Sequence, residues 1–394
     1  MSNPYIIYLS PYDILRPRTN QLSDVRFTEG FAQNHCHTHL IVPYVVRTDN
    51  ISKSEVEDTY GLKSHINIHY CPTRFTEDVK GGWQLAQVAW HGIRKTFTIL
   101  KKRKNKNQTY IISRSSHLLR PYFILRKIFP SRFKNVVLIH WAHDYNISSS
   151  HTRIYQLADY LLATNSSILN SILKRSKRNN KEGSFTLNPI TEAQAVENIT
   201  KEEARKEVKL VEIKTPLVVY TGKIGINYDQ ELKYILEAAQ QLPHYTFLFT
   251  GGKPKTVAFW EDYCSGLGLN NILFTGYLSD YRKIKYYQYS ADVLISYYTK
   301  QGHDVRYNFP NKICEYMLTG NPMVSPNYPA TRDLLTDNNC TFTTPENSQA
   351  LAKSIKEIIE NPLPAQQKAL QAAKDVREIT FKKVAARLLK QFPK

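Results

Sequence analysis

Residues 307–325 (YNFPNKICEYMLTGNPMVS) hold a lysine and a glutamate at the spacing of neighbouring positions on a helix. Pro310 favours a helix that begins here, because proline is well tolerated in the first turn. The backbone amides at such an N-terminus, near Asn311, can bind a phosphate group, and Lys312 adds a compact positive charge. Glu315, about one turn further along, can accept hydrogen bonds from ribose hydroxyls. The segment indicates either a nucleotide site or an ordinary capped helix with a Lys–Glu pair on its surface.

Glycines follow directly after three apolar runs in the second half of the chain: LVVYTG, FLFTGG and ILFTG. The glycines concerned include Gly222 and Gly251, and Tyr277 comes just after the third run. Glycine lets backbone amides approach a ligand closely. Each turn alone is also ordinary strand-to-helix chemistry, but the three together favour a nucleotide-type site. None matches GxGxxG or the P-loop pattern, so dehydrogenases and Walker-type nucleotidases gain no support.

The first half of the chain offers a histidine and a polar loop. His143 lies just beyond the apolar run VVLIH, where an imidazole can orient hydroxyl groups near a reacting centre. His140 is the neighbour that can be mistaken for it. The loop after the first apolar run carries Arg16, Arg18 and Asn20 and can bind a phosphate group, although a solvated loop would have the same composition.

Several of these segments occur in the same order in a known family. LVVYTGK, LGLNNILFTGY and NKICEYMLTGNPMV, all within residues 217–325, resemble the C-terminal domain of retaining group 1 glycosyltransferases, glycosyltransferase family 4. VVLIHWAHD and LADYLLATNSS in the first half are similar to this family more loosely. The resemblance implies an α/β protein of the GT-B class, in which two Rossmann-like, doubly wound domains face each other across a cleft.

The resemblance also implies roles for the candidate residues. The donor would be a nucleotide-diphosphate sugar, held mainly by the C-terminal domain without a metal or other cofactor, and the sugar would be transferred with retention. Glu315 matches the second glutamate of the family's E-x7-E motif, which binds the ribose, and Tyr307 occupies the position of the first glutamate. Lys223 matches a basic position that contacts the diphosphate, and with Lys312 it would stabilise the leaving group. His143 matches a histidine of the acceptor-binding domain.

Two groups of candidate binding residues follow. Those for the donor are Gly222, Lys223, Gly251, Tyr277, Asn311, Lys312 and Glu315. Those for the acceptor or a phosphate are Arg16, Arg18 and Asn20. The catalytic candidate is His143. A nucleotide-sugar epimerase and a degenerate, non-catalytic partner subunit are the alternatives within this fold, and the tyrosine at 307 would suit the second of them.

The elements that must position these residues alternate regularly. Apolar runs predict strands at residues 5–9, 38–46, 65–70, 109–113, 136–140, 160–163, 217–220, 245–249, 272–274, 293–296 and 323–324, with helical segments between them. Such alternation predicts parallel sheets that are covered on both faces. We expect an N-terminal domain over 1–190, a connector over 191–215 and a nucleotide-sugar domain over 216–378. The final segment, 379–394, is expected to be a helix, and packing back on the N-terminal domain is one option for it.

The net charge of +19 is concentrated in the first half of the chain. Residues 79–143 contain no Asp or Glu but fourteen Lys and Arg. So strong a field points to a polyanionic partner, either an anionic membrane surface or a nucleic acid. The stretch also mixes aromatic and aliphatic residues with the basic ones, which favours a membrane that carries a lipid-linked acceptor for cell-envelope polysaccharide synthesis. Nucleic-acid binding rests on charge alone, since no RNP motif, helix-turn-helix signature or zinc finger is present.

The five cysteines are odd in number and scattered, which indicates buried thiols in a reducing compartment. The cluster HCHTH at residues 35–39 looks like a metal site but has no matching set of acidic or cysteine ligands nearby. We expect neither a secretory signal nor a membrane-spanning helix. The sequence therefore predicts a cytoplasmic protein, peripheral on the inner face of the cell membrane.

Overall fold

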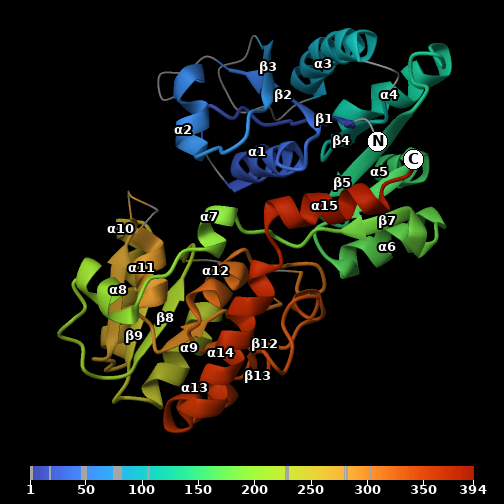
Figure 1. Cartoon of the computed structure of the whole chain (residues 1–394). Coiled ribbons are helices and arrows are strands. Elements are labelled where there is room, and N and C mark those ends of the chain that lie inside the picture. The colour runs from blue at the N-terminus through green and yellow to red at the C-terminus, as the bar shows by residue number, and fades with distance from the viewer. Residues whose placement is uncertain are drawn as a thin grey trace. The chain divides into compact units, whose positions relative to one another are not determined.

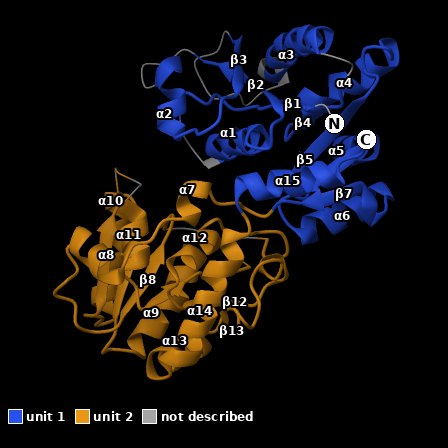
Figure 2. Cartoon of the chain, viewed as in Figure 1, with its two compact units in different colours: residues 1–186, 380–394 blue, residues 187–379 orange. Residues whose placement is uncertain are grey.

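The computed structural model describes residues 3–16, 19–45, 51–73, 82–103, 107–226, 230–278, 280, 283–300 and 304–394. The chain forms two compact units (Figure 2). Unit 1 comprises residues 1–186 and 380–394, and unit 2 comprises residues 187–379.

Unit 1 contains a seven-stranded sheet in which every pair of neighbours is parallel, with the order β3-β2-β1-β4-β5-β6-β7 (Figure 1). The strands are β1 (Tyr5–Leu9), β2 (His37–Tyr44), β3 (Asn67–Pro72), β4 (Thr109–Ser113), β5 (Val136–Ala142), β6 (Tyr160–Ala163) and β7 (Gly183–Phe185). Strands β4, β5 and β6 are buried along their whole length, because helices cover both faces of the sheet. The apolar runs predicted six of these strands, and the short β7 carried too weak a pattern.

The helices of unit 1 lie between these strands, together with one helix from the C-terminus. They are α1 (Thr19–Ala32), α2 (Val56–Tyr60), α3 (Gly82–Lys102), α4 (Ser116–Ile128), α5 (Ser149–Leu157), α6 (Ser166–Ser176) and α15 (Phe381–Gln391). Several begin where a side chain accepts a hydrogen bond from the first turn, as Ser115 does from the amide of Leu118 and Asn165 from that of Ile168. Helices α3 and α4 pack together against one face of the sheet, and α1 packs against α15 on the other (Figure 1).

Aromatic contacts fix α15 within unit 1. The ring of Phe381 lies 5.2 Å from that of Phe27 in α1. Phe392, just after the helix, packs against Tyr110 of β4 at 4.9 Å and Tyr160 of β6 at 5.6 Å. The chain therefore returns to its first unit after completing the second.

Unit 2 contains a six-stranded sheet, again wholly parallel, in the order β10-β9-β8-β11-β12-β13. Its strands are β8 (Leu217–Thr221), β9 (Thr246–Thr250), β10 (Ile272–Gly276), β11 (Val293–Ile295), β12 (Met323–Pro326) and β13 (Thr341–Thr343). Its helices are α7 (Glu192–Ala195), α8 (Lys201–Glu207), α9 (Gln230–Gln240), α10 (Pro254–Gly266), α11 (Ile284–Tyr289), α12 (Lys312–Thr319), α13 (Ser348–Glu360) and α14 (Pro362–Arg377). In the core, helices α9, α10 and α13 pack against the central strands. Leu236, Trp260 and Ile355 of these helices are all buried.

Three segments of unit 2 differ from the sequence-based expectation, and one is the short strand β13, whose residues TFT form no apolar run. Residues 191–215 pack as part of the unit, because Lys201 and Arg205 both bind the carboxylate of Asp292, at 2.8 and 2.9 Å. Helix α14 was not predicted, because its buried face consists of four alanines and one valine, and two prolines stand in its first turn. Proline is tolerated at that position, and alanines produce only a weak apolar stripe.

All five cysteines are free and buried. Burial raises the pKa of the thiols of Cys36 and Cys71 to about 12, so these groups stay protonated at neutral pH. The two parallel α/β sheets agree with the predicted fold class.

A leucine pair on α15 tests its place in unit 1. Leu388 is fully buried and Leu389 is half-buried. Leu388→Ala should lower the free energy of unfolding by about 3 kcal/mol, because it removes buried methyl groups and leaves a cavity. Leu389→Ala should lower the free energy of unfolding much less, because that side chain is only half-buried. Urea unfolding followed by tryptophan fluorescence would measure both, and equal losses would contradict the packing of α15.

Candidate functional site

The carboxyl ends of β8, β9 and β10 in unit 2 come close together through glycines. The amide of Gly222 donates to the carbonyl of Thr250 at 3.0 Å, and the amide of Gly251 donates to that of Gly276 at 3.1 Å. Gly251 has φ +127°, and a Cβ there would lie 2.0 Å from the carbonyl oxygen of Gly222. Only glycine fits at this position, so the backbone itself forms the edge that a ligand would meet.

Lys312, the first residue of α12, reaches this edge. Its ammonium group lies 3.8 Å from the centre of the Tyr220 ring in β8. A Cβ built on Gly222 would lie 3.0 Å from the same nitrogen, so the lysine head sits directly over the glycine. Two candidates that are 90 residues apart in the chain, Gly222 and Lys312, are thus adjacent in the structure.

A hydrogen-bonded network supports Glu315 behind this lysine. Its carboxylate accepts a hydrogen bond of 2.8 Å from the buried amide of Gln288. Gln288 also donates to the hydroxyl of Thr221 at 3.2 Å, and the amide of Thr221 donates to the hydroxyl of Tyr316 at 2.8 Å. The network joins β8, α11 and α12, so the half-buried Glu315 is held in a set orientation at the strand edge.

The other donor candidates are more exposed. Lys223 is exposed just after β8, and Asn311 is exposed immediately before α12. Tyr277 follows β10 with 74% of its surface exposed. All of these residues lie at or beyond carboxyl ends of strands or at the start of α12. Tyr307 is half-buried, and the Arg306 guanidinium lies 5.2 Å from its ring.

Unit 1 has a second polar cluster at the carboxyl edge of its sheet, centred on the buried Arg114. The guanidinium lies 2.8 Å from the carboxylate of Asp24 in α1 and donates to the hydroxyl of Tyr8 in β1 at 3.1 Å. Its carbon also lies 4.4 Å from the centre of the Trp141 ring in β5. The His143 ring packs on the same tryptophan at 4.7 Å. The cluster therefore joins β1, β4, β5 and α1.

Charge and burial set the protonation of this cluster. Burial would lower the pKa of Arg114, but Asp24, Tyr8 and Tyr12 outweigh it and raise that pKa, so the guanidinium stays charged. Burial, the charge of Arg114 and the nearby His140 hold the pKa of His143 well below its usual value. His143 is therefore a neutral imidazole, and its Nε2 is buried with no hydrogen-bond partner in the described part of the chain. Such a nitrogen is suited to a hydroxyl group of a ligand.

The remaining candidates lie near the same end of β1. Arg16 is half-buried in the segment that follows the strand, and Asn20 is exposed in the first turn of α1. Arg18 lies outside the described residues.

Sequence reasoning missed the residues that support the site. Arg114 follows the apolar run TYIIS directly, which is the same signal that identified the glycine turns. Asp24 and Gln288 gave no signal, because their partners are distant in the chain. Of the HCHTH cluster, His37 and His39 share one face of β2, but no group of three or more potential ligands among the described residues could hold a metal ion.

Comparisons with known proteins relate one segment by sequence, and nearly the whole chain by fold, to glycosyltransferases. Residues 215–361 match the family model described as Glycosyl transferases group 1. TuaH of Bacillus subtilis (strain 168), whose provisional name is teichuronic acid biosynthesis glycosyltransferase, is 35% identical over 109 residues. This match covers 27% of the present chain and 26% of TuaH, so the chain spans about a quarter of that relative's length.

Two solved structures are similar along nearly the whole chain. A glycosyltransferase from Rickettsia africae ESF-5 has a TM-score of 0.72 and 15% identity, covering 99% of this chain and 98% of that one. Anabaena Alr3699/HepE, in complex with UDP and glucose, has a TM-score of 0.66 and 16% identity, covering 98% of each chain. The fold is thus the α/β fold of two Rossmann-like domains found in GT-B glycosyltransferases, and residues 215–361 are similar in sequence to the group 1 glycosyl transferases.

His140 makes the stability of unit 1 depend on pH. Its ring is buried, and burial together with His151 lowers its pKa to about 4. The unfolded chain takes up this proton near pH 6.5, so stability is lost as the pH falls from about 6.5 towards 4. The variant His140→Gln lacks this titrating group. Over this pH range its free energy of unfolding should therefore fall by up to about 3 kcal/mol less than that of the parent protein.

Urea unfolding at several pH values would measure the effect, with His117→Gln as the control. His117 is an exposed histidine on α4, so its loss should leave the slope of the unfolding free energy against pH nearly unchanged. An unchanged slope in the His140 variant would contradict a buried neutral imidazole.

Proposed function

We propose that the protein is a retaining, metal-independent glycosyltransferase. It moves a sugar from a nucleotide-diphosphate sugar to a lipid-linked saccharide in cell-envelope polysaccharide or glycolipid synthesis. The observation that carries this proposal is the position of Lys312 over Gly222, with Glu315 behind it, inside the segment that matches group 1 glycosyl transferases. This arrangement offers a cation, a close backbone approach and a carboxylate at the strand edge where α/β sheets bind ligands.

Unit 2 would bind the donor. Lys312 and the exposed Lys223 would stabilise the negative charge that develops on the diphosphate as it leaves. Glu315, oriented by Gln288, would accept hydrogen bonds from the ribose hydroxyls. Because Anabaena HepE was solved with UDP and glucose, a uridine diphosphate hexose is the first donor to test.

Unit 1 would bind the acceptor. The neutral imidazole of His143 would hold a hydroxyl group near the reacting carbon, while the buried Arg114 would act through Trp141 and Tyr8 as a positioning residue. In the transfer, the bond from the anomeric carbon to the phosphate oxygen breaks, and its electron pair leaves with the nucleoside diphosphate. The acceptor oxygen bonds to that carbon, and its proton passes to an oxygen of the departing diphosphate. Retention of configuration rests on the family resemblance.

Glu315 provides the test of the donor site. A thermal-shift screen across nucleotide sugars should find one donor that stabilises the protein strongly. Glu315→Gln should lower kcat/KM for transfer from that donor about 10- to 100-fold, because a charged hydrogen bond is worth about 1.5–3 kcal/mol. Glu237→Gln, at an exposed position on α9, is the matched control and should leave the rate unchanged.

Two results would contradict this proposal. A protein that no nucleotide sugar stabilises would lack the donor site. A protein that binds a donor but neither transfers nor hydrolyses it would be a degenerate partner, the alternative that the tyrosine at 307 favours.

The membrane part of the proposal rests on an exposed face of α4. Ile124, Ile128 and Phe129 are 58%, 60% and 44% exposed, and the exposed Lys127 and Arg132 lie beside them in the chain. Apolar side chains among basic ones suit the surface of an anionic bilayer. None of the described helices is long and apolar enough to cross a membrane. We propose a peripheral position on the cytoplasmic face, where the lipid-linked acceptor would be reached.

Flotation with phosphatidylglycerol vesicles at low salt tests this position. The protein should float with the vesicles, and high salt should release it, because exposed charges are screened. Ile128→Glu should weaken binding at least about ten-fold through lost apolar burial and added repulsion. Leu363→Glu, at a residue of unit 2 that is 79% exposed, is the control and should float like the parent. Failure of the parent protein to float at low salt would overturn the membrane proposal.

A further inference from the structure

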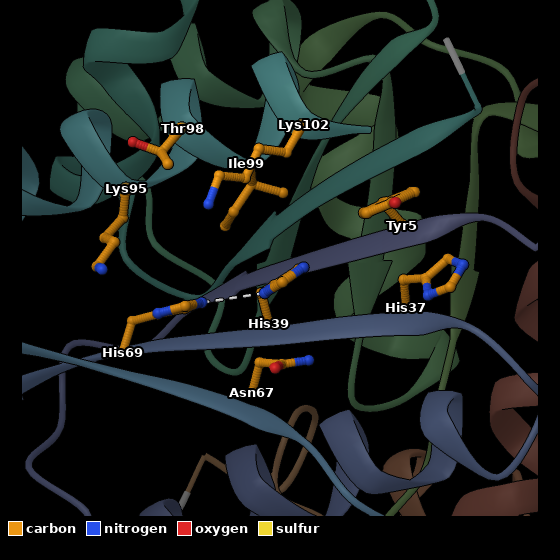
Figure 3. A pocket seen from close by; sticks show the side chains of 9 residues that line it. All are labelled: Tyr5, His37, His39, Asn67, His69, Lys95, Thr98, Ile99 and Lys102. Carbon is orange, nitrogen blue, oxygen red and sulfur yellow. Dashed lines mark hydrogen bonds between the residues drawn. The ribbon is translucent and has the colours of Figure 1, made fainter. Parts of the chain in front are cut away.

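Unit 1 contains a cavity of about 340 Å³ at the amino ends of β1, β2 and β3. The C-terminal half of α3 covers it, and it is open to solvent on one side. Figure 3 shows the imidazoles on the strands and the lysines on the helix lining the same space. Its polar lining residues include Tyr5, His37, His39, His69, Lys95 and Lys102.

The register of the strands puts these side chains on one face of the sheet. Tyr5 is paired with His37, and His69 is paired with Ile41, two positions after His39. Partners in a parallel ladder point to the same face, as do residues two apart. Further along this face, Leu9 and Ile41 pack against α3 and α4 as an ordinary apolar core. Towards the amino ends, imidazoles and a phenol occupy the positions that would continue that core.

The rings are close to one another and to the lysines. His39 Nδ1 lies 3.0 Å from His69 Nε2 in a hydrogen bond, and the two rings are stacked with centres 5.2 Å apart. The ring of Tyr5 lies 4.6 Å from that of His37. Lys95 and Lys102 add two basic side chains from the helix, and no Asp or Glu is among the described residues that line the cavity. The described lining thus concentrates hydrogen-bond donors and basic groups and includes no acidic side chain.

We propose that this cavity binds the phosphate group of a phosphomonoester, with Lys95 and Lys102 supplying charge and the imidazoles of His37, His39 and His69 supplying hydrogen bonds. A phosphate group is a common ligand that accepts hydrogen bonds from several cationic donors and is repelled by carboxylates. A metal ion is disfavoured because no three or more His, Cys, Asp or Glu side chains in the described residues, these histidines included, are placed so that they could hold one. The volume lies in the range of small-molecule sites.

Protonation strengthens the proposal. Burial, then the neighbouring His69 and His37, lower the pKa of His39 to about 4, and burial and Lys95 lower that of His69. The groups that face these rings are Tyr5 from β1, the other histidines from β2 and β3, and the two lysines from α3. A dianion would counter the repulsion among these groups and raise both pKa values. Binding would therefore take up protons and become tighter as the pH falls from 8 to 6.

The cavity is independent of the proposed glycosyl transfer. It lies at the amino ends of the strands, whereas His143 and Arg114 follow the carboxyl ends of β5 and β4. Loss of phosphate binding should leave transfer from a soluble donor to a soluble acceptor unchanged. The failure of one proposal is thereby distinguishable from the failure of the other.

Calorimetric titration with sulfate tests the site, because sulfate remains a dianion between pH 6 and 8. The parent protein should bind it more tightly at pH 6, with shifts of the His39 and His69 ring resonances in NMR spectra. Lys95→Gln should weaken binding about ten-fold. Lys101→Gln is the matched control, since Lys101 is exposed on α3 but does not line the cavity, and it should have little effect. Equal weakening by the two variants, or no binding of sulfate at either pH, would overturn the proposal.

Vesicles distinguish a lipid headgroup from a free phosphate. Phosphatidic acid presents a phosphomonoester, whereas phosphatidylglycerol presents a singly charged diester. A preference for phosphatidic acid that Lys95→Gln removes and Lys101→Gln keeps would assign a headgroup. Sulfate binding without that preference would assign a soluble phosphomonoester, and either result supports the site.

Discussion

Both sheets of this protein are wholly parallel, and parallel strands can be joined only by crossover connections that return the chain to the starting edge. Every carboxyl end in a unit therefore lies at one edge of its sheet and every amino end at the other. This constraint brings Gly222, Gly251 and Gly276 together although the chain separates them by 54 residues. It also brings Tyr8, Arg114 and Trp141 together in unit 1. The shared direction of the strands thus places the candidate site of each unit at one edge of its sheet.

Charge is used differently in the two units. In unit 1, the Arg114 side chain is largely buried and held by Asp24 and Tyr8, so it organises the strand edge with little exposure to solvent. Removing one partner of such a pair leaves a buried charge without compensation, at a cost of about 3–5 kcal/mol. In unit 2, Lys312 stands over a glycine and against the face of Tyr220, where its charge can reach a ligand. The excess of basic residues in the first half of the chain thus includes structural, surface and cavity-lining side chains.

The C-terminal helix belongs to unit 1, so the chain passes from unit 1 to unit 2 and back again. Helix α15 follows the whole of unit 2, yet its aromatic neighbours Phe27, Tyr110 and Tyr160 belong to unit 1. Unit 1 therefore includes residues 380–394, which follow all of unit 2 in the chain. The buried Leu388 and the rings of Phe381 and Phe392 supply the apolar surface that holds this helix in place.

The sequence by itself determined the alternation of strands and helices, because apolar runs such as VVLIH have lengths and flanking turns that local patterns reveal. It also determined Lys312 and Glu315 as a pair, since three residues along a helix set their spacing. Helix α14 was not predicted because its buried face is made mostly of alanines. Only the tertiary structure decided that Gln288 orients Glu315, that Asp24 balances Arg114, and that three histidines share a cavity with two lysines. Those relations depend on the order of strands in the sheet, which brings distant residues together and leaves no local trace in the chain.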